Sequence, residues 1–197
     1  MNTLKAQIIK RCFDLCLSFF LIVLLFFPVL VIAVIIGLKF KENPIFVHER
    51  IGKHRKPFLL YKLRTIPGNL PKDVMGKDVL LSRFSRFLLH YKLNELPQLF
   101  NILKGDMSFV GPRPDIKGYA DELSADDAVI LEVKPGLTGP ATIKYRNEQL
   151  LLEEKENPLQ FNRDVIWPDK VKLNKAYIEN WSFKKDLLIL FKTLFKT

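Results

Sequence analysis

Residues 15–38 read LCLSFFLIVLLFFPVLVIAVIIGL, and this stretch decides how the chain is organised. Only Ser18, Pro28 and Gly37 interrupt the apolar run, and no charged residue falls inside it. A bilayer core is about 30 Å thick and takes about 20 apolar residues of helix, so the run is long enough to cross it. The sequence therefore predicts a protein that works at a membrane.

The topology of this segment depends on the residues at its two ends and its middle. The flanking basic residues are Lys5, Lys10 and Arg11 before it, and Lys39 and Lys41 after it. Because basic residues mark the cytoplasmic side, both ends are expected there. Pro28 lies near the middle, where it removes a backbone hydrogen bond and bends the helix. These features favour two topologies equally: a re-entrant helix that returns to the same face, and a kinked spanning helix.

The charge balance limits the partners of the remaining chain, which is the size of one globular domain. Lys and Arg number 31 against 21 Asp and Glu, a net charge of +10. Beside a membrane segment, anionic lipid headgroups are the expected target. Nucleic-acid binding is not expected, because only the charge would support it and no helix-turn-helix, zinc or aromatic RNA-binding motif is present.

The two cysteines are Cys12 and Cys16, which lie four residues apart without a nearby histidine. They are expected to serve packing.

The pattern of elements predicts a helix-rich α+β fold. Short strands are expected at 44–47 and 57–62, around a turn at Gly52, and a polar loop at 67–78. Helices are expected at 79–92, 95–104 and 118–132 and over most of the rest, with a break at Trp167-Pro168. The helix at 79–92 and the one from residue 182, which includes Lys196, each have a basic face and an apolar face. Such helices lie in a membrane interface or pack their apolar faces on the core.

The densest polar segment is KLNELPQLFNILKGDMSFVGPRP, from Lys92 to Pro114. Asn94 is a candidate N-cap of a helix with Pro97 in its first turn, and a helix N-terminus attracts phosphate. The turn Gly111-Pro112-Arg113-Pro114 presents one guanidinium, a group suited to bidentate phosphate contact.

Other charges complete the candidate site. YKLRT adds the cations Lys62 and Arg64, and Glu95 and Asp106 supply acids that suit a divalent metal. Phosphoryl transfer needs cations and a metal of this kind. Each residue alone also fits an ordinary cap, surface ion pair or turn.

Three segments, KLNELPQLFNILKGDMSFVGPRP, YKLRT and KPGLTGPA, resemble the bacterial sugar transferase family, the monotopic phosphoglycosyl transferases. The resemblance covers nearly the whole chain. It implies transfer of a sugar-1-phosphate from a nucleotide diphosphate sugar, usually a UDP-sugar, to undecaprenyl phosphate or another polyprenol phosphate. Magnesium is the implied cofactor. The reaction would be the first membrane step of capsule, exopolysaccharide, lipopolysaccharide or protein-glycan assembly.

The resemblance also implies an architecture. Residues 1–40 would form a re-entrant membrane helix broken at Pro28, and residues 41–197 a cytoplasmic catalytic domain with amphipathic helices in the interface. The protein would lie at the cytoplasmic face of the bacterial inner membrane, next to anionic lipid, and a homodimer is left open.

Asn94 departs from the family pattern, which has an Asp-Glu dyad before Leu-Pro-Gln. In the family the aspartate is the nucleophile that forms a covalent phosphosugar intermediate, and it helps to bind the metal. An amide is a poor nucleophile and a weaker metal ligand. Three interpretations stay open. The chain is an inactive form, engineered or natural; or Glu95 acts as the nucleophile; or the reaction goes by direct displacement within a ternary complex. The main alternative function is that of a membrane-anchored pseudoenzyme.

The residue roles are a hypothesis drawn from the resemblance. Asn94 marks the nucleophile position, and Glu95 and Asp106 are metal or catalytic acids. Lys62, Arg64 and Arg113 contact the diphosphate, Gly111, Pro112 and Pro114 hold the turn, and Gly136, Thr138 and Gly139 form a loop near the site.

Overall fold

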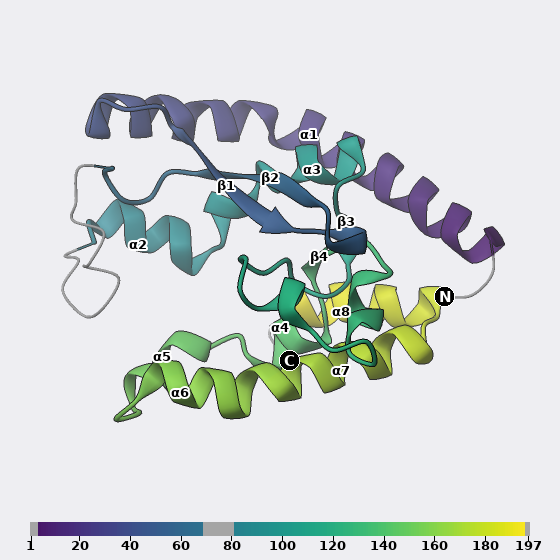
Figure 1. The fold of residues 1–197 in the computed structure, drawn as a ribbon. Helices are drawn as coiled ribbons and strands as arrows, with labels where there is room; N and C mark the ends of the chain where they lie inside the picture. The colour runs from purple at the N-terminus through teal and green to yellow at the C-terminus, as the bar shows by residue number, and fades with distance from the viewer. Residues whose placement is uncertain (1–3, 69–80, 196–197) are drawn as a thin grey trace.

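The computed structural model describes residues 4–68 and 81–195. One long helix, α1 (Leu4–Phe40), lies along one side of the molecule, and the rest of the chain folds against it (Figure 1). The shorter helices are α2 (Arg83–His90), α3 (Gln98–Lys104), α4 (Pro140–Lys144), α5 (Glu148–Glu153), α6 (Pro158–Phe161), α7 (Trp167–Glu179) and α8 (Phe183–Phe195). With two small sheets, the fold is helix-rich α+β, as the sequence predicts.

Helix α1 is continuous over its 37 residues. Pro28 lies inside it, and the helix continues through that residue. A proline in a long apolar helix removes one hydrogen bond without ending the helix when packing supports both halves. Within residues 4–68 and 81–195, α1 is the one helix long and apolar enough to cross a membrane. Its topology in a bilayer stays a prediction.

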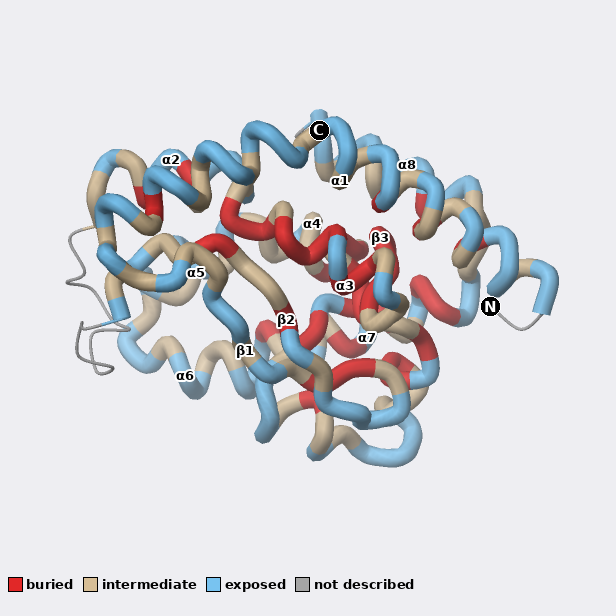
Figure 2. Tube along the Cα trace, turned by 90° about the horizontal axis from the view of Figure 1, so that it is seen from above, coloured by how far each residue is buried: buried red, intermediate tan, exposed pale blue. Residues whose placement is uncertain are grey.

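The inner face of α1 packs on the domain on both sides of Pro28. The first half contributes Phe13, Leu17, Leu21, Ile22 and Leu25 to the margin of the main core. In the second half, fully buried Ile36 forms a smaller cluster with Leu63 and Leu88. The outer face is exposed, as the pale-blue stretches of the tube show (Figure 2), and among its large hydrophobic residues beyond residue 10 Phe27 and Leu38 are the most exposed, at 71% and 76%.

Buried polar contacts attach the start of α1 to the domain. Lys10 forms an ion pair with Asp186 of α8, and Asp186 also accepts hydrogen bonds from the Tyr177 hydroxyl (2.6 Å) and the Trp181 indole (3.0 Å). One turn along, Asp14 accepts a hydrogen bond from the backbone N–H of Phe109 at 3.0 Å. Because ionised groups are costly to bury alone, these pairings define how α1 lies on the domain.

Two short sheets lie below α1. The hairpin of β1 (Ile45–Ile51) and β2 (Pro57–Leu63) is antiparallel, with Ile45 opposite Leu63, which confirms the predicted strands and extends the first. The second sheet pairs β3 (Ser108–Val110) in parallel with β4 (Gly136–Thr138) and has no counterpart in the predictions. Strands of three residues carry too little periodicity to be recognised.

Several expected helices differ. The segment 118–132 forms only two 3₁₀ turns, η4 (Ala120–Glu122) and η5 (Ala128–Leu131), because Gly118 adopts φ 94° and aspartates favour turns over helix interiors. Trp167-Pro168 does not break the helical chain: α6, a π-helical turn at Asn162–Ile166 and α7 follow one another without a gap, and Pro168 lies at the start of α7.

Other predictions also differ or fall outside the structure. Cys12 and Cys16 are exposed free thiols, so within this chain they do not serve packing, because their positions fall on the outward side of α1. Residues 69–80, which include most of the expected loop and the start of the helix at 79–92, lie outside the described residues, as does Lys196.

Candidate active site

The polar segment NELPQ folds as a tight 3₁₀ turn, η3 (Leu93–Glu95), followed by α3. The helix begins at Gln98 with Pro97 at its N-cap position, so Asn94 is not the cap of α3 as the sequence suggested. Because Pro97 has no N–H, the carbonyl of Leu93 accepts instead from Leu96 at 3.2 Å, which is the 3₁₀ pattern. The turn buries Asn94 and Glu95, at 6% and 9% exposure.

Glu95 is the centre of the site. Arg113 donates to both carboxylate oxygens of Glu95, from Nη2 to Oε1 at 2.7 Å and from Nη1 to Oε2 at 3.4 Å. Lys62 Nζ lies 3.5 Å from Oε1. The three side chains come from the η3 turn, from the turn after β3 and from β2. The fold therefore brings together three of the residues predicted for the site, which we call the Glu95 cluster.

The electrostatics of the Glu95 cluster favour its ionised form. Burial alone would raise the pKa of Glu95, but the charges of Arg113 and Lys62 outweigh burial and lower that pKa to about 2. Burial lowers the pKa of Lys62, and the Glu95 carboxylate opposes this shift. Two cations around one acid leave a net positive site, which is suited to a phosphate.

Three glycines shape the turn that carries Arg113. Gly111 follows β3, and its N–H donates to the carbonyl of Thr138 at 2.9 Å. A Cβ at Gly136 or Gly139 would collide with the backbone of Gly111, and a Cβ at Gly111 would collide with the carbonyl of Lys134. The motifs VGPRP and KPGLTGPA are therefore two backbones in direct contact. KPGLTGPA lies beside the Arg113 turn, although Gly136–Thr138 is a strand rather than the expected loop.

A second ion pair lies beside the Glu95 cluster. Arg50 of β1 is 3.9 Å from Asp115, and the N–H of Ile51 donates to the carbonyl of Asp115 at 2.9 Å. Burial raises the pKa of Asp115. This pair fixes the hairpin to the chain just after Arg113, and sequence reasoning missed it, because neither residue stands out in its own segment.

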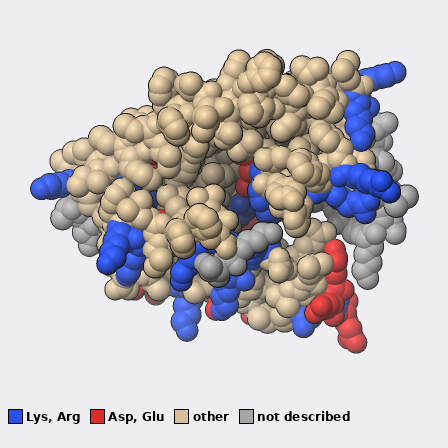
Figure 3. Space-filling view, turned by 180° about the vertical axis from the view of Figure 1, so that it is seen from behind, with Lys and Arg blue, Asp and Glu red and all other residues tan. Residues whose placement is uncertain are grey.

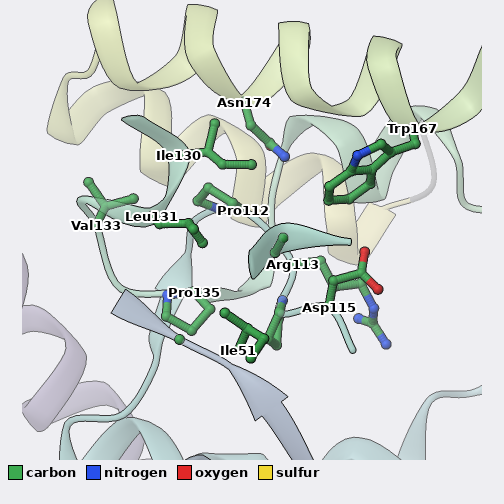
Figure 4. A pocket seen from close by; sticks show the side chains of 13 residues that line it. Ile51, Pro112, Arg113, Asp115, Ile130, Leu131, Val133, Pro135, Trp167 and Asn174 are labelled. Carbon is green, nitrogen blue, oxygen red and sulfur yellow. The ribbon is translucent and has the colours of Figure 1, made fainter. Parts of the chain in front are cut away.

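A small cavity lies behind the Arg113 turn. It has a volume of about 20 Å³, and Arg113, Asp115, Trp167 and Asn174 are among its lining residues (Figure 4). That volume suits one water molecule. Asn174 Oδ1 is buried without a partner, so a water in this cavity would satisfy it.

Two predicted site residues lie away from the Glu95 cluster. Arg64 pairs with Glu42 at 3.1 Å and donates to the carbonyl of Asn43 at 2.9 Å. Asp106 follows the C-terminus of α3, where Lys104 pairs with it at 3.1 Å. Glu95 precedes the N-terminus of the same helix, so α3, about 10 Å long, separates the two acids.

Asn101 is a structural residue that the sequence analysis missed. Its amide accepts from the N–H of Tyr61 at 3.1 Å and donates to the carbonyl of Leu59 at 2.7 Å. These bonds give partners to two backbone groups on the outer edge of β2 and join the strand to α3. As a result, Lys62, the residue after Tyr61, is held beside Glu95. An asparagine inside an apolar helical stretch is the signal that could have identified it.

The donors available to a metal are few. Residues 4–68 and 81–195 contain no group of three or more His, Cys, Asp or Glu side chains placed to hold a metal ion. Near the Glu95 cluster, Asn94 Oδ1 is buried and has no hydrogen-bond partner. Together with the Glu95 carboxylate it would supply two hard oxygen donors. Magnesium typically binds through one or two carboxylates plus substrate phosphates, so this pair fits it only with substrate present.

Comparisons with known proteins identify the family of the chain. A family model described as "Bacterial sugar transferase" matches residues 5–197. The chain is 38% identical to the "Uncharacterized sugar transferase EpsL" of Bacillus subtilis, over 96% of this chain and 87% of the relative.

Two functionally named relatives also match. An "Undecaprenyl-phosphate galactose phosphotransferase" of Salmonella typhimurium is 30% identical, and a "UDP-glucose:undecaprenyl-phosphate glucose-1-phosphate transferase" of Klebsiella pneumoniae is 34% identical. Each match covers 96% of this chain, which spans only 40% of either relative. The protein belongs to the bacterial sugar transferase family.

Proposed function

We propose that this protein transfers a sugar-1-phosphate from a nucleotide diphosphate sugar, most simply a UDP-sugar, to undecaprenyl phosphate. The carrying observation is the Glu95 cluster, where Arg113 and Lys62 meet one buried acid. The names of the Salmonella and Klebsiella relatives, which specify undecaprenyl phosphate, support the acceptor. In this proposal the chain acts in an early membrane step of polysaccharide or glycan assembly.

The surface supports a membrane setting. Seen from behind, the face over α1 is nearly free of charged side chains, and Lys and Arg gather at its ends and beneath it (Figure 3). The outward side of α8 adds Leu188, Phe191 and Leu194, at 51%, 53% and 76% exposure. An apolar face bordered by cations is typical of proteins that lie in an anionic bilayer surface. We place the catalytic domain on the cytoplasmic face, where nucleotide sugars are made.

The chemistry follows from the charges. Arg113 and Lys62 would bind the diphosphate, and both would stabilise charge that develops on the leaving nucleoside monophosphate. An oxygen of the acceptor phosphate attacks the phosphorus that bears the sugar, and the bond from that phosphorus to the bridging oxygen breaks. No general base is needed, because a phosphate monoester with a second pKa near 6 is already ionised at pH 7.

Asn94 favours this direct displacement over a covalent intermediate. Its amide is no nucleophile, and Glu95 is held by two cations with a pKa of about 2, which makes its carboxylate a weak one. Glu95 would instead orient Arg113 and Lys62. Bound magnesium, held by Glu95 and Asn94, would neutralise phosphate charge. Asp106 is too far along α3 to join them.

The test is release of UMP from a panel of UDP-sugars by purified protein with undecaprenyl phosphate and magnesium. Turnover by the wild-type chain, with sequential rather than ping-pong kinetics, is expected. Glu95→Gln should nearly abolish it, and wild-type rates in that variant would overturn the assignment of Glu95.

A pseudoenzyme is the second candidate, and Asn94 is the observation that favours it. It predicts nucleotide-sugar binding without UMP release. If Asn94→Asp then gains activity while the wild-type chain stays silent, the chain is a nucleophile-deficient form of the transferase.

A further inference from the structure

Lys92 has an unusual backbone for a lysine. Its φ is 56° and its ψ is 21°, in the left-handed region, and it directly precedes the η3 turn. For a residue with a side chain this conformation costs about 1 kcal/mol or more, and it persists where the surroundings or a function require it. Glycine or asparagine would adopt it more easily, so the lysine side chain itself calls for an explanation.

The side chain of Lys92 is exposed and uncommitted. In the part of the chain that the structure describes, no ion pair or side-chain hydrogen bond involves it. The Glu95 N–H donates to its carbonyl at 3.0 Å, so the residue lies at the edge of the Glu95 cluster. The charge of Lys92 also contributes to the low pKa of Glu95, so the ammonium group acts on the same site.

Exposed aromatic rings adjoin Lys92. Phe87 and Tyr91, at 49% and 60% exposure, have ring centroids 4.9 Å apart. They belong to α2 and its C-cap, which pack beside the second half of α1 through Leu88 and Ile36. No Asp or Glu occurs from residue 79 to residue 94. We call Phe87, Tyr91 and Lys92 the α2 corner.

The charges of the two substrates leave room for one more cation. Glu95, Arg113 and Lys62 together carry one net positive charge, and the magnesium of the proposed function would add two. A diphosphate brings about two negative charges and a phosphate monoester nearly two more, so the balance stays negative. Among the described residues, Lys92 is an exposed cation beside the cluster that pairs with no acid, and the aromatic rings next to it suit an apolar chain.

We propose that the α2 corner is the docking site of the acceptor, with Lys92 binding its terminal phosphate and Phe87 and Tyr91 contacting the first isoprene units. The occupant is thus a polyprenyl phosphate rather than an anionic phospholipid of the bilayer. The inference rests on the proposed function for its acceptor, and it adds the residues that select that acceptor.

The test compares Lys92→Asn, which removes the charge but suits the left-handed backbone, with Lys92→Arg, which keeps the charge. Lys172→Asn on α7 is the matched control, an exposed lysine far along the chain from the site. The probes are farnesyl phosphate, neutral farnesol and a UDP-sugar, each titrated against full-length protein in detergent. Binding of vesicles with and without phosphatidylglycerol is measured in parallel.

We expect Lys92→Asn to weaken farnesyl phosphate binding and raise the acceptor KM about tenfold, with UDP-sugar binding, farnesol binding and kcat at saturating acceptor unchanged. Lys92→Arg should restore most of the affinity. Tyr91→Ser should raise KM about equally for short-chain and long-chain prenyl phosphates, because all of them carry the first isoprene units.

Three results would overturn the inference: an equal effect of Lys172→Asn, a loss of UDP-sugar affinity in Lys92→Asn, or a loss of vesicle binding with farnesyl phosphate binding intact. If the wild-type chain turns over no sugar, the proposed function fails separately. The difference between farnesyl phosphate and farnesol binding then still decides whether the α2 corner binds a prenyl phosphate.

Discussion

Replacing Glu95 by glutamine should make the stability of the protein markedly less dependent on acid pH. The pKa of Glu95 falls from 4.5 to about 2 on folding, against the effect of burial, because of Arg113 and Lys62. One pKa unit is about 1.4 kcal/mol, so the ionised carboxylate contributes roughly 3 kcal/mol to the free energy of unfolding at neutral pH. A depressed pKa means that this contribution is present above about pH 4.5 and is lost as pH falls toward 2.

The assay is chemical unfolding of wild type and Glu95→Gln in the same detergent, at intervals from pH 7 to pH 3. We expect a difference of roughly 3 kcal/mol at pH 7 that shrinks by more than half at pH 3. Glu42→Gln is the matched control, because Glu42 also pairs with an arginine, but its side chain is 29% exposed. That pair should contribute less than about 1 kcal/mol. Equal stability of Glu95→Gln and wild type at pH 7 would refute this account of the Glu95 cluster. So would a difference in the free energy of unfolding that does not change with pH.

Three further substitutions test the supports of the site. Gly136→Ala should abolish folding or lower the Tm strongly, because its Cβ meets the backbone of the facing turn, whereas Gly37→Ala has open space and should leave the Tm unchanged or higher. Asn101→Ala should lower the free energy of unfolding by about 2–4 kcal/mol in denaturant titrations, since an N–H and a carbonyl at the edge of β2 lose their partner; a change below 1 kcal/mol would contradict this. Asp186→Asn should cost about 3–5 kcal/mol, measured the same way, because it leaves Lys10 buried without a counter-charge, and a neutral effect would mean that α1 is not held by this pair.

The sequence predicted the elements whose cause is local. The apolar run from residue 15 predicted a long helix, which the structure extends to Leu4–Phe40, and the glycine at 52 between two short runs predicted the hairpin. Glu95, Lys62 and Arg113 were correctly grouped from motifs, although Lys62 lies 33 residues before Glu95 and Arg113 lies 18 residues after it. The grouping could be made from the motifs because each motif forms a single turn or strand, and these turns and strands meet at the Glu95 cluster.

The sequence did not reveal the ion pairs of Arg64 and Asp106. Residue type assigned both to the site, and in the structure Arg64 pairs with Glu42 and Asp106 with Lys104, two residues earlier. Contacts of this kind are not visible in the sequence of either partner. The parallel contact of β3 with β4 depends on glycines that let two backbones meet, and neither strand has a detectable period. Helix α1 illustrates the same limit, since its apolar run was evident while the partners of Lys10 and Asp14 lie in the last third and the middle of the chain.

The attachment of α1 has a practical consequence for anyone who makes this protein. A soluble catalytic fragment is commonly sought by deleting an apolar leader, here by starting after Phe40. Such a deletion would expose the core surface beneath Phe13, Leu17 and Ile36, and would strand Asp186 without Lys10. The fragment would lose part of its hydrophobic core together with its membrane helix. The full-length protein therefore has to be kept in detergent or lipid from extraction to assay.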